Sequence, residues 1–358
     1  MRQQLIYFLR LLIATLIYWC LVMCFFILIR YYDLSGEPGI EVAFSYEASI
    51  WELTRFGMFL GIFIGLFYAI VEFLFDRFLM KRLYLGLSIL IRTWVYLLLL
   101  ISSTTLIMEL AEAEWGFDFD NERGWWQTNR MFWVFVIYFG IFSLGFSFLK
   151  IAKERFGREN FVKLLLGKYR KPTEEQRIFM FLDLKSSTTI AETLGHLSYS
   201  GLIQECFLDL NDFLSGHRAE VYQYVGDEAV ISWQFDVGIR RNNCIKLFFA
   251  FQDRLEKRTE HYLEKYSVVP EFKAGLHGGE LVVVEVGNVK KELAYHGDVI
   301  NTAARIQKEC NKYGEKLLIS GSLLERLDLS SDYVAKAMGE IDLKGKKEKI
   351  PIFAIQKA

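Results

Sequence analysis

The chain has 358 residues, which is enough for one or two domains with hydrophobic cores of their own. Hydrophobic residues make up 53% of it and aromatic residues 16%, which is too apolar for a uniformly soluble protein. The 42 basic and 43 acidic residues nearly balance, so the net charge of -1 indicates neither nucleic acid nor an acidic partner.

Four long apolar stretches occupy most of the first 150 residues, at about 5–29, 56–75, 83–107 and 131–149. Each has the ~20 residues that an α-helix needs to cross a bilayer. The first stretch is too long for a cleavable signal peptide and has no small-residue cleavage site. The sequence therefore predicts an N-terminal bundle of four transmembrane helices over residues 1–150, with the lipid bilayer as its partner.

Three charged residues interrupt these stretches, namely Arg10, Glu72 and Arg92. Both arginines lie near a predicted cytoplasmic end, so long side chains that reach the lipid headgroups explain them better than a buried ion site. Glu72 is interpreted in the same way.

The loops give the orientation. Residues 33–52 contain five acidic residues and no Lys or Arg. Basic residues gather instead in the short middle loop and after the fourth stretch: Arg77, Lys81, Arg82, Lys150, Lys153, Arg155, Arg158, Lys163, Lys168, Arg170 and Lys171. Because positive charge marks the cytoplasmic side, the sequence predicts a multi-pass protein of the cell inner membrane. Its N-terminus and its large C-terminal part are then both cytoplasmic.

Residues 151–174 form a basic linker with apolar residues at Phe161, Leu164 and Leu165. This composition favours a short helix that leaves the membrane. Two positions for it stay open, namely contact with the anionic leaflet and pairing with its counterpart in a dimer.

From about residue 175 the pattern alternates between strands and helices. In chain order, it predicts a buried strand at 177–184, a helix at 186–216 with a break near Gly195, a hairpin at 221–233, a helix at about 238–265, two strands within 272–287, a helix at 297–314, and short strands around 333–343 and 350–355. This order predicts an α+β domain over residues 175–358, with a mixed sheet and covering helices.

Two aspartates lie where this pattern turns. Asp183 is near the end of the first strand, and Asp227 is at the tip of the hairpin VYQYVGDEAVISW. If the two strands are neighbours, the carboxylates meet at one edge of the sheet, and such a pair suits Mg²⁺ that also contacts phosphate. Ser186, Ser187 and Thr188 then open a helix whose free N–H groups make a phosphate seat. Together these features predict a metal–triphosphate site.

Asn301 and Arg305 are four residues apart in a predicted helix and therefore share one face. A neutral hydrogen-bonding group beside a guanidinium suits a transition state in which charge grows on a phosphoryl group. Taken alone, this helix is better explained by a solvated polar face.

With these motifs the chain resembles the class III nucleotidyl cyclase catalytic domain, the fold of adenylyl and guanylyl cyclases. The resemblance runs through FLDLKSST, VGDEAV, GLHGGELV, GDVINTAAR and LKGKKEKIPIFAI, in this order, over about residues 177–355. It implies a ferredoxin-like mixed sheet with covering helices.

The resemblance also implies roles for individual residues. Asp183, with Leu184 beside it, and Asp227 are expected to bind two Mg²⁺ or Mn²⁺ ions per site. Asn301 is expected to orient the ribose, and Arg305 to stabilise the phosphoryl transition state. The triphosphate-binding lysine is expected at Lys344, with Lys346 as the alternative. The active site is expected at the interface of a homodimer, in which one copy supplies the aspartates and the other supplies the Asn/Arg pair.

The base of the substrate is the most open point. Adenylyl cyclases of this family usually have lysine where Gln223 stands, and aspartate or threonine where Ala294 stands. Guanylyl cyclases usually have glutamate at the first position. Because a glutamine amide both donates and accepts, it suits adenine or guanine. ATP is favoured, with GTP as the alternative.

Two other functions compete with this interpretation. A diguanylate cyclase is suggested by VGDEAV, but Val225 and Ala229 depart from that family's motif. A cyclase-like nucleotide sensor without activity is suggested by the unusual Gln223 and Ala294. The presence of both Asn301 and Arg305 argues against these two functions.

Overall fold

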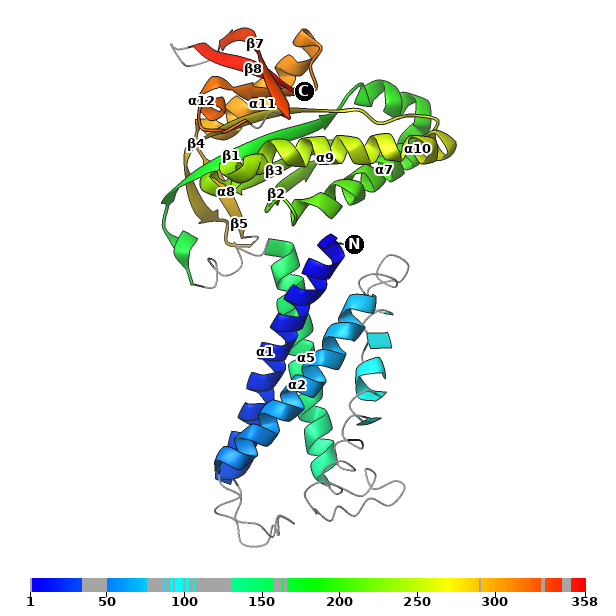
Figure 1. Cartoon of the computed structure of the whole chain (residues 1–358), viewed down its shortest axis with the longest axis vertical. Helices are drawn as coiled ribbons and strands as arrows, with labels where there is room; N and C mark the ends of the chain where they lie inside the picture. Colours follow the sequence, from blue (N-terminus) through cyan, green and yellow to red (C-terminus); the bar gives the residue numbers. More distant parts are fainter. Residues whose placement is uncertain are drawn as a thin grey trace. The chain divides into compact units, whose positions relative to one another are not determined.

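The structure is a computed structural model, and it describes the chain in segments. These are residues 2–33, 50–75, 130–156, 166–289, 291–329, 332–342 and 349–358, with isolated positions at 87, 91–92, 94–98, 101–102, 106 and 163. The chain divides into two compact units, Met1–Ala152 and Lys153–Ala358, each described here by itself (Figure 1).

Three helices of the first unit are long and apolar enough to cross a membrane. They are α1 (Arg2–Asp33), α2 (Ile50–Leu74) and α5 (Arg130–Phe156). Their candidate spans are Tyr7–Ile29, Gly57–Leu74 and Phe132–Lys150, which correspond to three of the four predicted stretches. The remaining stretch, residues 83–107, lies largely outside the described residues, although the described positions within it are helical.

Helices α1 and α2 pack with their backbones close together. A Cβ atom placed on Gly61 would lie 2.5 Å from the Cα atom of Cys20, so no side chain fits between the helices there. Gly57 and Gly65, one turn to either side, also face α1. Small residues at such spacing allow helices to pack closely in a membrane, where apolar burial alone does not drive association.

Glu72 is fully buried in the first unit, contrary to the sequence-based interpretation. Its carboxylate accepts hydrogen bonds from Lys150 of α5 and from Tyr96, at 2.5 Å for Tyr96, and lies 3.4 Å from the Arg92 guanidinium. Glu72 and Arg92 therefore belong to a buried ion cluster. The prediction was wrong because the basic partners come from other helices.

The second unit contains an eight-stranded mixed sheet. Its strands are β1 (Thr173–Leu184), β2 (Glu220–Val225), β3 (Glu228–Gln234), β4 (Phe272–Val286), β5 (Glu292–His296), β6 (Leu317–Ser320), β7 (Tyr333–Asp342) and β8 (Lys349–Lys357). The order is β2-β3-β1-β4-β6-β8-β7, with β5 paired to β4. Among the strand pairs of the described residues, only β4 and β6 are parallel, and the predicted α+β fold is confirmed.

The helices of this unit are α7 (Ser187–Leu214), α8 (Phe235–Ile239), α9 (Asn243–Lys257), α10 (Thr259–Tyr266), α11 (Asp298–Tyr313) and α12 (Gly321–Leu324), with short 3₁₀ turns η2 (Lys168–Arg170) and η3 (Arg240–Asn242).

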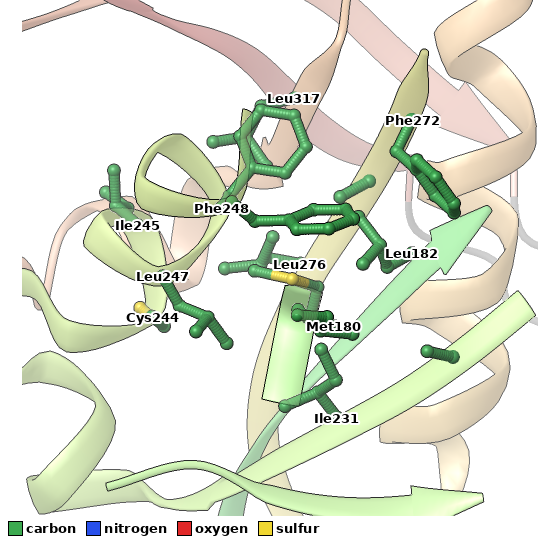
Figure 2. Packing of buried hydrophobic residues seen from close by; sticks show 14 of the residues in the cluster. Met180, Leu182, Ile231, Cys244, Ile245, Leu247, Phe248, Phe272, Leu276 and Leu317 are labelled. Atoms are coloured by element: carbon green, nitrogen blue, oxygen red, sulfur yellow. The ribbon is translucent and has the colours of Figure 1, made fainter. Parts of the chain in front are cut away.

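Strand β1 separates two cores because its side chains alternate between the faces of the sheet. Ile178, Met180 and Leu182 point into the core covered by α7, α9 and α10. Phe179 and Phe181 point into the core covered by α11. Figure 2 shows the first core, where Leu247 and Phe248 of α9 lie against the sheet residues Met180, Ile231 and Leu276.

Two predicted elements differ from the structure. Residues 272–286 form one continuous strand where two were predicted, because β4 pairs with β1 along the whole of β1, through Gly278 and Gly279. The helix predicted at 238–265 is divided among α8, η3, α9 and α10. Arg241 and Asn242 have left-handed φ angles of 56° and 57°, and an α-helix cannot continue through such residues. The sequence-based prediction also missed β6.

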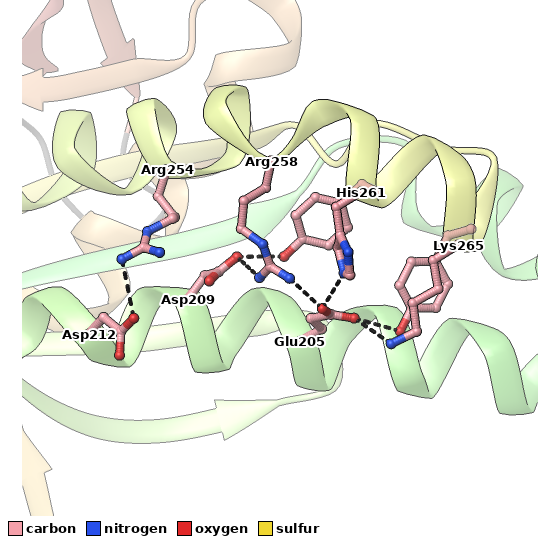
Figure 3. A network of polar contacts seen from close by, with 9 residues as sticks. Glu205, Asp209, Asp212, Arg254, Arg258, His261 and Lys265 are labelled. Atoms are coloured by element: carbon pink, nitrogen blue, oxygen red, sulfur yellow. Dashed lines mark hydrogen bonds and ion pairs between the residues drawn. The ribbon is translucent and has the colours of Figure 1, made fainter. Parts of the chain in front are cut away.

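A network of ions joins α7 to α9 and α10. Glu205 of α7 accepts from Arg258 at 2.6 Å and from Lys265 at 2.8 Å, and His261 Nε2 lies 2.6 Å from it. Arg258 also binds Asp209 (Figure 3). Burial by itself would raise the pKa of Glu205, but the donors around it outweigh burial and lower the pKa to about 2.

Candidate active site

The pairing of β1 with β3 brings the two predicted metal aspartates to one edge of the sheet. Asp183 lies directly opposite Glu228, the residue that follows Asp227. Asp227 is in the turn between β2 and β3, next to Gly226, whose φ of 62° is left-handed and favours glycine. The sequence predicted that the two carboxylates would meet if their strands were neighbours, and β1 and β3 are neighbours.

Asp183 is held by donors from two other elements. Gln307 of α11 donates from Nε2 to Asp183 Oδ2 at 2.8 Å. Lys273, opposite Asp183 on β4, places Nζ 3.2 Å from the same oxygen. Burial raises the pKa of Asp183, the Lys273 and Gln307 donors oppose this, and the Asp227 carboxylate raises the pKa further. The site therefore concentrates negative charge that a cation would neutralise.

Asp227 has a buried oxygen that its surroundings leave unsatisfied. Within the described part of the chain, Oδ2 of Asp227 is buried and accepts no hydrogen bond. A buried carboxylate oxygen without a donor is costly, and a bound cation is one of the few groups that removes this cost.

These residues fit a divalent metal ion that shares its coordination with a substrate. Among the described residues, no three His, Cys, Asp or Glu side chains form a ready-made metal cage. Mg²⁺ is commonly bound by one or two carboxylates together with water and substrate phosphates, and two aspartates suffice for that arrangement. Mn²⁺ accepts the same oxygen ligands.

The predicted phosphate seat lies beside these carboxylates in the chain. Helix α7 begins at Ser187, directly after Ser186, which has a left-handed φ of 57° and makes no side-chain capping bond. Thr188 is exposed in the first turn. The first N–H groups of this long helix have no intrahelical partners and, with the positive end of the helix dipole, favour a bound anion.

The predicted transition-state pair lies on α11. Asn301 is exposed and Arg305 is half-buried, one turn apart on the same face of the helix. The opposite side of α11 packs on the sheet through Val299, Ala303 and Ile306. The helix thus holds the pair on a rigid support.

Comparison with known proteins identifies the domain that carries these residues. The family model for the adenylate and guanylate cyclase catalytic domain matches residues 169–357, more than half of the chain. The chain belongs to this cyclase family.

Relatives and a solved structure agree with this assignment. The chain is 35% identical over 208 residues to Adenylate cyclase 2 of Rhizobium meliloti (strain 1021), which covers 58% of the chain and 57% of that protein. It is 27% identical over 183 residues to Adenylate cyclase 1 of the same organism, over 49% of the chain and 27% of that protein. The chain therefore matches less than two thirds of either relative's length.

The fold of a bacterial light-regulated adenylyl cyclase is similar, with a TM-score of 0.51 and 16% identity over 61% of this chain and 64% of that one.

Leu184, the residue after Asp183, has a buried side chain. It is 1% exposed, belongs to the core under α7 and has no ligand atom. A metal contact at this position would therefore have to use the main-chain carbonyl.

The two predicted base-contacting residues lie on β2 and β5, which are not neighbours in the sheet. Gln223 is exposed on β2, and Ala294 is half-buried on β5. Their neighbours Tyr222 and Tyr295 are in edge-to-face contact, with ring centroids 4.9 Å apart. A β-bulge between Val221 and Gln223 shifts the register of β2 at this point. The side chains of Tyr222 and Tyr295 therefore link β2 to β5 next to the two predicted base-binding positions.

Lys344 and its alternative Lys346 lie outside the described residues. The sequence-based prediction also missed three residues that the structure places near the aspartates: Lys273, Gln307 and Tyr199. Burial raises the pKa of Tyr199, and the Asp227 and Asp183 carboxylates raise it further. Of these three residues, only Gln307 had a sequence signal, namely its position in the predicted helix two residues after Arg305.

Proposed function

We propose that this chain is an adenylate cyclase of the inner membrane, which converts ATP to 3',5'-cyclic AMP and pyrophosphate with Mg²⁺ or Mn²⁺. The observation that carries this proposal is the meeting of Asp183 and Asp227 at one sheet edge, with a buried Asp227 oxygen that accepts no hydrogen bond within the described residues. Membership of the cyclase family gives these carboxylates a substrate class, the nucleoside triphosphates.

In the proposed reaction, the ribose 3'-oxygen bonds to the α-phosphorus, the hydroxyl proton passes to water, and the bond to pyrophosphate breaks. Bound divalent ions would acidify that hydroxyl and neutralise the phosphates. Asp183 and Asp227 would hold the ions, and the α7 N-terminus would donate N–H groups to phosphate oxygens. Asn301 orients the ribose, and Arg305 donates to the phosphoryl oxygens as their charge grows. Removal of one such donor typically costs ~10²–10³ in rate.

ATP is proposed as the substrate because the relatives with the highest identity given above carry the name adenylate cyclase. Gln223 keeps GTP as the alternative, because its amide also complements the guanine edge. Full-length protein in lipid nanodiscs, incubated with Mn²⁺ and either ATP or GTP, should form cyclic AMP faster than cyclic GMP by mass spectrometry. Faster cyclic GMP formation would assign a guanylate cyclase, and no cyclic product would favour the nucleotide sensor.

The role of the hairpin is tested by Asp227→Asn, which removes charge but little volume. It should abolish cyclisation while the protein keeps its thermal stability. Asp212→Asn is the matched control, because Asp212 is an exposed residue of α7 that pairs with Arg254 at 3.3 Å. Substantial activity of Asp227→Asn at saturating Mn²⁺ would refute its assignment as a metal ligand.

We also propose that two copies share each site, with the aspartates from one and Asn301 and Arg305 from the other. Two-fold symmetry then creates two identical composite sites. Asp227→Asn and Arg305→Ala should each be inactive, but co-expression should restore about a quarter of wild-type activity, since half of randomly paired dimers are mixed and each has one intact site. No recovery in a confirmed mixed dimer would exclude this arrangement.

A further inference from the structure

Gln307 is a buried side chain whose amide is aimed at a predicted metal ligand. It is 3% exposed and donates from Nε2 to Oδ2 of Asp183, 124 positions earlier in the chain, at 2.8 Å. Gln307 follows Arg305 by two residues, so it projects about 200° around the helix from Arg305. Helix α11 therefore presents Arg305 on one side and supports Asp183 with the other.

The helix is pressed against the sheet at this point. A Cβ atom on Gly275 of β4 would lie 2.2 Å from the backbone nitrogen of Gln307 and 2.6 Å from its Cα atom. No residue with a side chain fits there, so the α11 backbone rests directly on β4. Strand β4 is in turn paired with β1 beside Asp183. The distance between Gln307 and Asp183 is therefore set by two backbone contacts, that of α11 with β4 and that of β4 with β1.

A second connection runs in parallel with the first. Lys273 Nζ lies 3.2 Å from Asp183 Oδ2 and 3.1 Å from Asn311 Oδ1, and Asn311 is also on α11. Both donors to Asp183 contact Oδ2, so they fix the rotation of the carboxylate while Oδ1 keeps its capacity for a cation. Gln307 is neutral and therefore orients Asp183 without cancelling the negative charge that attracts the metal ion.

We propose that Gln307 is a positioning residue for metal binding. It holds the Asp183 carboxylate in its metal-binding orientation and ties it to the helix that carries Asn301 and Arg305. This inference rests on the proposed function, in which Asp183 is a metal ligand. Groups that orient metal ligands in this way typically contribute 10–100-fold to metal affinity.

The test compares two buried glutamines that each lose a hydrogen bond. Gln307→Met keeps the length of the side chain and removes the donor. Gln252→Met is the matched control, since Gln252 of α9 is 7% exposed and donates to the Phe272 carbonyl at 2.9 Å. Gln307→Asn is a second test variant, which stays polar but is too short to reach Asp183. Mn²⁺ binding to full-length protein in nanodiscs is measured by electron paramagnetic resonance, with 3'-deoxy-ATP as a nucleotide that has no attacking hydroxyl.

Both Gln307 variants should weaken Mn²⁺ binding about 10–100-fold, whereas Gln252→Met should bind as wild type does. In activity assays, the Mn²⁺ concentration at half-maximal rate should rise with Gln307→Met, and the rate should recover largely at saturating Mn²⁺. Wild-type affinity in Gln307→Met, or equal weakening in Gln252→Met, would overturn the inference. Asp183→Asn distinguishes a failure of the Gln307 inference from a failure of the proposed function. Wild-type Mn²⁺ affinity in Asp183→Asn would overturn the assignment of Asp183 as a metal ligand.

Discussion

Glu175 lies near the start of β1 and binds the end of the linker, which makes its substitution a quantitative test of the second unit. Its Oε1 atom accepts from Lys168 at 2.7 Å and from the Tyr169 hydroxyl at 2.8 Å. Its Oε2 atom accepts from Arg177 Nε at 3.0 Å. Arg177 is fully buried and also pairs with Glu220 at the start of β2. The carboxylate therefore connects the linker to the strands that carry the site.

The expected loss of stability follows from the pKa of this group. Burial by itself would raise the pKa of Glu175, but the three donors outweigh burial and lower it from 4.5 to about 2. A shift of this size corresponds to about 3 kcal/mol of stability at neutral pH. The Glu175 side chain is 9% exposed, so solvent screens this carboxylate little, but its partner Lys168 is 42% exposed and contributes less. This stability loss also falls at the lower end of the roughly 3–5 kcal/mol expected when one partner of a buried ion pair is removed.

Glu175→Gln should therefore lower the melting temperature of the second unit by about 6–12 °C, since 1 kcal/mol corresponds to about 2–4 °C for a unit of this size. Calorimetry of the full-length protein in detergent micelles measures this change. Glu174→Gln is the matched control, because Glu174 is the exposed neighbour on the same strand and should shift the melt by little.

The pH dependence gives an independent check. Because the folded-state pKa of Glu175 is lowered, its contribution to stability is complete above about pH 4.5 and is lost as the pH falls through about 2. The difference in stability between wild type and Glu175→Gln should shrink over that window. A melt of Glu175→Gln within 1 °C, on the order of 0.3 kcal/mol, of that of Glu174→Gln at pH 7 would refute the reasoning.

Three further predictions test other parts of the molecule. If Gln223 contacts the base, Gln223→Glu should shift the ratio of kcat/KM values towards GTP, because a carboxylate accepts from the guanine edge. An unchanged ratio would show that Gln223 makes no such contact. Glu72→Gln should lower the thermal stability of the first unit in nanodiscs, because it leaves two basic groups without their buried carboxylate. Arg10→Gln, at an exposed position, is the control and should leave the stability unchanged. Equal melting temperatures for the two variants would contradict the ion cluster. Glu205→Gln should destabilise the second unit above about pH 4.5, because the pKa of Glu205 is lowered to about 2 in the folded protein. The difference in stability from wild type should vanish as the pH falls towards about 2. A constant difference between about pH 4.5 and about pH 2 would contradict this prediction.

Local features of the second unit were predictable from the sequence because short-range patterns encode them. A run of apolar residues marked β1, and the Gly-Asp pair marked the turn between β2 and β3. The break at Gly195 and the helix that ends before Gly314 were also found where predicted. In the first unit, hydropathy alone identified the three candidate spans.

Long-range partners were not predictable in this way. The sequence placed Asp183 and Asp227 at strand ends, but only the β1–β3 pairing set Asp183 opposite Glu228. The same limit explains the error at Glu72, whose partner Lys150 is 78 positions away.

The sequence by itself thus determined the two-part organisation, most of the strands and helices, and the residue types of the candidate metal–triphosphate site, because hydropathy, periodicity and turn residues act over a few positions. Only the tertiary structure decided which side chains support that site. Gln307 and Lys273 reach Asp183 because β4 pairs with β1 and because α11 rests on Gly275. Contacts of this kind depend on the packing of whole elements against one another, which no local pattern of residues specifies.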